Sequence, residues 1–89
     1  MDMVVTAKEV SALFDALIRG TQARETLEEW ARVRMAANDT RDLTFDPPND
    51  EARLWVAIAY LSGVGLRVAP GTYLHSNEDF EAFRRKHRL

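Results

Sequence analysis

Apolar residues recur at helical spacing near the start of the chain. Five of them follow the i, i+3, i+4, i+7 repeat of a helix with one buried face: Val10, Leu13, Phe14, Leu17 and Ile18. Thr6 and Glu9 form a T-x-x-E capping box, in which each side chain can satisfy an unpaired N–H at the helix start. Gly20 ends this helix, because glycine enters the left-handed cap conformation without steric cost.

A second stretch of helical spacing runs from Thr21 to about Ala37 and ends at Asn38. Its buried stripe consists of small, aliphatic and aromatic residues: Ala23, Leu27, Trp30, Ala31 and Met35. Charged residues occupy the other positions, which predicts a helix with one face in solvent.

Residues 38–49 are expected to form a long acidic loop, because Pro47 and Pro48 cannot sit inside a helix. Leu43 and Phe45 alternate with polar neighbours, so a short extended piece can hold these two side chains against the core. Asn49 is the expected cap of a third helix, over "DEARLWVAIAYLSG". That helix is apolar nearly all round, which predicts a central position with burial on most sides.

The last third of the chain contains turn and cap signals. Pro70 and Gly71 fit the two central positions of a type II turn, so residues 66–74 can form a very short hairpin. Ser76 and Asp79 predict the start of a fourth helix that runs to about residue 88. His75 precedes this cap and is expected to shield the helix start or to bond a loop carbonyl. The predicted fold is all-α, a compact bundle of about four short helices.

Length and composition limit what this bundle can be. The 89 residues suffice for one helical domain, residues 1–89. The absence of cysteine excludes disulfides and thiolate metal sites. The N-terminus does not read as a signal peptide, and no apolar run approaches the roughly 20 residues of a membrane span, so a cytoplasmic protein without membrane contact is expected.

Candidate catalytic groups are few. His75 and His87 lie twelve positions apart on different predicted elements, and Asp79 adds only one weak metal-ligand pair. None of the serines stands in a strand-turn-helix elbow flanked by glycines. We therefore expect no enzymatic activity, no cofactor and no metal.

Charge is distributed unevenly along the chain, although its net value is only −2. Five carboxylates are concentrated between the second and third helices: Asp39, Asp42, Asp46, Asp50 and Glu51. Four permanent cations are concentrated near the end of the chain: Arg84, Arg85, Lys86 and Arg88. Each group can be a binding surface, and each can also be an ordinary solvated segment.

Several segments resemble a set of short bacterial proteins of uncharacterised function. The likeness rests on Trp30-Ala31, on the W-x-A-x-x-x-L-x-G pattern that begins at Trp55, and on the Y-L-H-x-x-x-D-F pattern that begins at Tyr73. It covers roughly residues 24–83. Some proteins of this kind look like immunity partners of secreted toxins, which implies protein binding without catalysis.

Two functions follow from these observations. The main hypothesis is an immunity or antitoxin-like inhibitor that binds a protein partner, such as a basic toxin domain, through the five acidic residues. The alternative is a helix-turn-helix-like DNA-binding regulator that uses the basic C-terminal helix. Nucleic acid is considered the less favoured partner, because the third helix offers Arg53 as its one basic side chain. The partner's identity and the oligomeric state stay open.

Overall fold

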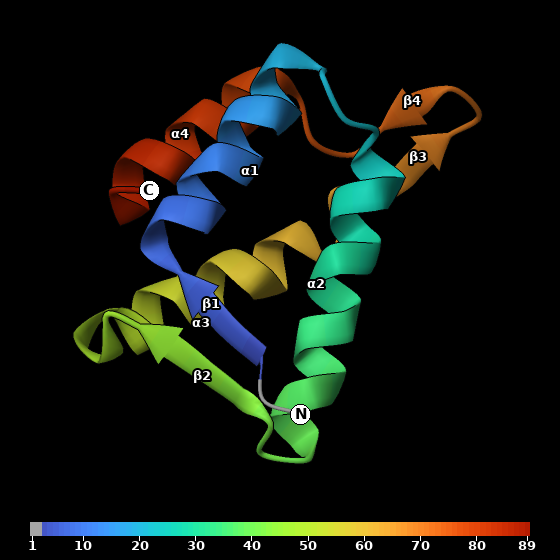
Figure 1. The fold of residues 1–89 in the computed structure, drawn as a ribbon. Helices are drawn as coiled ribbons and strands as arrows, with labels where there is room; N and C mark the ends of the chain where they lie inside the picture. The colour runs from blue at the N-terminus through green and yellow to red at the C-terminus, as the bar shows by residue number, and fades with distance from the viewer. Residues whose placement is uncertain (1–2) are drawn as a thin grey trace.

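The computed structural model describes residues 3–89, which form helices and short strands in mixed order. The elements in chain order are β1 (Met3–Thr6), α1 (Ala7–Arg19), α2 (Arg24–Asp39), β2 (Leu43–Asp46), the 3-10 turn η1 (Pro48–Asp50), α3 (Glu51–Leu61), β3 (Arg67–Ala69), β4 (Thr72–Tyr73) and α4 (Asn77–His87). Helices α1 and α4 lie side by side, whereas α2 borders the opposite side of the molecule (Figure 1).

The all-α prediction is wrong, because the described chain also contains two small two-stranded sheets. Strand β1 pairs in parallel with β2, from Met3 opposite Leu43 to Thr6 opposite Asp46. The expected acidic loop therefore contains a strand and a 3-10 turn. The prediction that Leu43 and Phe45 point into the core is confirmed, since each is only 8% exposed.

The second sheet is the expected hairpin, formed by β3 and β4. Gly71 has a φ of 78°, as the third position of a type II turn requires. The Tyr73 hydroxyl donates to Glu25 Oε1 over 2.9 Å, and Arg67 Nη2 lies 3.3 Å from the same oxygen. One side of the hairpin is therefore attached to the first turn of α2, and the hairpin projects beside this helix (Figure 1).

Helix boundaries follow local signals with three differences. Thr6 caps α1, since its Oγ1 accepts from the Glu9 N–H over 2.9 Å, but the Glu9 Oε1 atom is buried without a partner in residues 3–89. Helix α2 begins at Arg24 instead of Thr21, because the backbone N–H of Thr21 bonds back to the Ala16 carbonyl at the end of α1. Asn49 lies within η1 instead of capping α3.

The core lies where α1, α2, α3, α4 and the β1–β2 sheet meet. Its buried members are Val5, Val10, Phe14, Leu17, Leu27, Ala31, Leu43, Phe45, Leu54, Ala57, Ile58, Leu61, Val64 and Phe80. Helix α3 contributes more of them than any other element, as expected for a central helix. It is not buried all round, however, because Val56 is 40% exposed. No helix within residues 3–89 is long and apolar enough to cross a lipid bilayer.

Candidate nucleic-acid interface

Helix α4 carries the basic residues, and a complete capping box fixes its start. The Ser76 Oγ accepts from the Asp79 N–H over 3.3 Å, and the Asp79 Oδ2 accepts from the Ser76 N–H over 2.9 Å. The His75 ring lies beside this turn, with its centroid 5.1 Å from that of Tyr60 and its Nδ1 3.9 Å from Asp79 Oδ2. Residues 3–89 contain no group of three or more histidine or carboxylate side chains that could hold a metal ion.

An aromatic cluster holds the second half of α4 against the domain. The Phe83 ring stacks on Tyr60, with centroids 3.9 Å apart and planes at 17°, and it also lies 5.7 Å from Phe14. The His87 ring also lies near Phe83, at a centroid distance of 4.4 Å. Burial raises the pKa of Tyr60, and the negative charge of Asp79 raises it further, so this hydroxyl stays neutral at physiological pH. The packing of these rings therefore fixes the position of the basic end of α4.

Arg84 is occupied by contacts within the domain. Its guanidinium donates to Asp15, to the Ser11 hydroxyl over 2.9 Å and to the Leu89 carbonyl over 2.7 Å. The hydrogen bond from Arg84 is the largest cause that holds the pKa of Asp15 below its ordinary value. We conclude that Arg84 joins α4 to α1 and is not free to bind a ligand.

Arg53 of α3 supports the same end of α4 from the other side. Its guanidinium donates to the backbone carbonyls of His87 and Arg88, and it pairs with Asp50 Oδ2 at 2.7 Å. The last carbonyls of a helix have no partners within the helix, so a guanidinium is a suitable group to satisfy them. Arg53 thus caps α4 and fixes where the neighbouring basic side chains project.

Three cations at the end of α4 remain free. Arg85, Lys86 and Arg88 are exposed, and none of their side chains takes part in an ion pair within residues 3–89. Helix α1 runs antiparallel to α4, since Asn77 Nδ2 bonds the Ile18 carbonyl at one end and Arg84 bonds Ser11 toward the other. Exposed Lys8, in the first turn of α1, therefore lies at the same end of the helix pair. Two elements combine here into one basic surface.

The five acidic residues do not form a single loop surface. Asp39 ends α2, Asp46 ends β2, and Glu51 begins α3. The other two are engaged within the domain: Asp42 accepts from the Thr40 hydroxyl over 2.7 Å, and Asp50 pairs with Arg53. Both partners are local, two positions away for Asp42 and three for Asp50, so the spacing in the sequence could have identified these two engaged carboxylates.

Comparisons with known proteins address the choice between the two hypotheses. The chain matches, over residues 4–87, a family model described as "YxzC DNA-binding protein". It is similar to the uncharacterised protein YxzC of Bacillus subtilis (strain 168), with 31% identity over 64 residues, which cover 72% of this chain and 47% of that protein. The chain thus spans about half the length of this curated relative. No solved structure matches the chain significantly.

These findings correct two expectations. The family description points to nucleic acid as the partner. The expectation of a protein partner, with nucleic acid less favoured, is therefore wrong. It also gives no support to an immunity or antitoxin role. The resemblance to short bacterial proteins stays a prediction, because neither match concerns its motifs. From the match over nearly its whole length, we conclude that the chain belongs to the YxzC family.

Proposed function

We propose that this protein is a non-catalytic DNA-binding protein whose contact surface is the basic end of the α1–α4 pair. The observation that carries the proposal is the set of free cations formed by Arg85, Lys86, Arg88 and Lys8, in a chain of the family described as DNA-binding. Phosphate contacts by Lys and Arg supply most non-specific affinity for DNA. A DNA-binding role also agrees with the cytoplasmic location expected from the sequence.

The contact differs from that of a helix-turn-helix motif. The helices joined by a short turn are α1 and α2, with residues 20–23 between them. The first turns of α2 expose Glu25 and Glu29, which repel phosphates, whereas a recognition helix inserts its N-terminal residues into the major groove. Helix α4 also begins with acidic residues, so it can meet DNA only through its C-terminal end. Contacts of this kind position a protein on the phosphate backbone of DNA and recognise little of the base sequence.

Fluorescence anisotropy with a labelled duplex tests this proposal. The Arg85→Gln/Lys86→Gln variant should bind DNA at least about tenfold more weakly, and the plot of log K against log salt should be shallower by about 2, or about one unit for each lost phosphate contact. Two duplexes of unrelated sequence should lose affinity equally.

A second variant controls for net charge. Arg19→Gln/Arg41→Gln also removes two exposed cations, from the end of α1 and from the turn before β2, and should retain most of the affinity. Equal losses in the two variants would show that bulk charge governs binding. An unchanged salt slope in the α4 variant would show that Arg85 and Lys86 do not contact DNA and that the interface lies elsewhere.

A further inference from the structure

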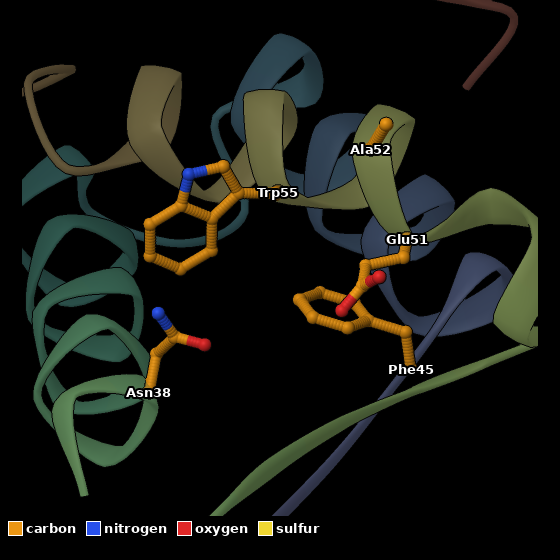
Figure 2. Close-up of a pocket in the computed structure, with 5 residues that line it drawn as sticks. All are labelled: Asn38, Phe45, Glu51, Ala52 and Trp55. Atoms are coloured by element: carbon orange, nitrogen blue, oxygen red, sulfur yellow. The ribbon is translucent and has the colours of Figure 1, made fainter. Parts of the chain in front are cut away.

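A hollow between α2, β2 and α3 is not used by the proposed DNA contact. Its lining consists of Asn38, Phe45, Glu51, Ala52 and Trp55, and its volume is about 270 Å³. A second hollow of about 280 Å³ shares Phe45 and Glu51 and continues along β2. Figure 2 shows the side chains of Asn38, Trp55, Phe45 and Glu51 directed toward one open space from three different elements.

Aromatic and acidic groups are combined in this hollow. The Trp55 indole and the Phe45 ring form its walls, and the faces of such rings attract cations, most strongly in tryptophan. The Glu51 side chain is exposed and forms no ion pair within the part of the chain that the structure describes. No basic side chain lines either hollow. An anion would therefore find only the neutral N–H groups of Asn38 and Trp55 beside a carboxylate that repels it, whereas a cation would meet a free carboxylate and two aromatic rings.

The remaining lining groups limit the size and shape of a ligand. Asn38 presents an amide, which can accept one ammonium N–H while Glu51 accepts another. Ala52 leaves room beside the rings for an apolar body. A volume of about 270 Å³ suits a compact molecule but not a folded partner. Asp46, exposed at the end of β2, adds to the negative potential around the opening.

We propose that this hollow binds a small organic cation, namely a protonated amine that carries a compact apolar or aromatic body. The ammonium group binds between the Glu51 carboxylate and the Asn38 amide oxygen, and the apolar body lies against Trp55 and Phe45. This site is independent of the DNA contact, so either proposal can fail without the other.

The experiment uses benzylammonium as the probe, in a ¹H–¹⁵N NMR titration at constant ionic strength. The Trp55 indole N–H and the Asn38 side-chain amide should shift and saturate, with a Kd of roughly 1 mM for so small a ligand. The Trp30 indole, which lies under Arg34 and is not part of the lining, should not shift. Benzyl alcohol, a neutral analogue of the probe, should bind at least about tenfold more weakly if the charge is recognised.

Matched variants locate the charge that matters. Glu51→Gln should weaken benzylammonium binding about tenfold or more, and Glu51→Asp should retain part of it. Asp46→Asn removes the same charge outside the lining and should change the Kd by less than about twofold. Equal binding of benzyl alcohol, or an equal loss in Glu51→Gln and Asp46→Asn, would overturn the proposal. Thermal unfolding of Glu51→Gln, an exposed substitution, checks that the fold is kept.

Discussion

Gly65 lies at a close contact between α2 and the turn that follows α3, and its substitution tests how that contact works. The Gly65 N–H donates to Glu28 Oε2 over 2.8 Å, and the Glu28 side chain is only 14% exposed. A Cβ on Gly65 would lie 3.3 Å from Glu28 Cδ and closer still to Oε2. Glu28 would have to turn away, and the hydrogen bond from Gly65 would be lost.

The cost can be worked out from this contact. A hydrogen bond to a charged group contributes about 1.5–3 kcal/mol net. Replacing glycine by alanine also stabilises the protein by about 0.4–1 kcal/mol, because the unfolded chain then has less conformational entropy to lose on folding. Gly65→Ala should therefore lower the free energy of unfolding by about 1–2 kcal/mol. For a domain of this size, that corresponds to a fall in Tm of roughly 4–16 °C.

Urea unfolding followed by circular dichroism, in a double-mutant cycle, measures the effect and its cause. In a Glu28→Ala background the obstructing carboxylate is absent, so Gly65→Ala should be neutral or slightly stabilising. Gly63→Ala is the control, since its Cβ would meet the flexible Leu66 side chain at 3.4 Å and the Tyr60 carbonyl oxygen at 3.9 Å, which is an ordinary contact distance. It should change stability by less than about 0.5 kcal/mol. A Gly65→Ala variant that costs as much without Glu28 as with it would refute the reasoning.

Three further expectations concern stability. Phe80→Ala should cost about 3–5 kcal/mol because the ring is fully buried, whereas Val56→Ala, at an exposed position, should cost less than about 0.5 kcal/mol; urea midpoints compare them. Ser76→Ala should cost about 1 kcal/mol by removing the α4 cap, and Ser62→Ala, at an exposed helix end, should cost less in the same assay. The pKa of Glu25 is held below its ordinary value, first by its own backbone N–H and then by Tyr73, so the stability from this group is present above pH 4.5 and is lost as the pH falls through the lowered value. Glu25→Gln should flatten the decline of the urea midpoint below about pH 5, and an unchanged decline would contradict this assignment.

Local signals predicted most of the helical structure, because their causes lie within a few residues. Thr6 caps α1, Gly20 ends it with a φ of 71°, and Ser76 and Asp79 start α4. The burial of Leu43 and Phe45 also followed from their alternation with polar neighbours. In each case the sequence pattern and the deciding interaction occupy the same short segment.

The missed features depend on partners far apart in the chain. Strand β1 has only four residues, and its pairing with β2 joins positions that are forty residues apart, such as Met3 and Leu43. Short strands carry little pattern, and their stability comes from the partner. The same limit applies in part to the basic surface. Helical spacing puts Arg84 on the face of Phe80 and Phe83, and Arg85 outside it, but the α1 residues that engage Arg84 lie 69 and 73 positions away in the chain.

The first turns of α3 bring together the two surfaces that are proposed to bind ligands. Successive side chains on a helix point about 100° apart, so neighbouring residues in the sequence contact different parts of the molecule. Glu51, Ala52 and Trp55 line the hollow, Leu54 is buried in the core, and Arg53 caps α4. A change that breaks this turn would disturb the hollow and the basic end together and could not assign a role to either. Glu51→Gln alters the hollow and leaves Arg53 in place. Arg53→Lys keeps the positive charge, but lysine lacks the planar guanidinium that bonds two backbone carbonyls and Asp50. A loss of DNA affinity in Arg53→Lys would therefore reflect the position of the end of α4, because Arg53 itself is committed to contacts within the domain.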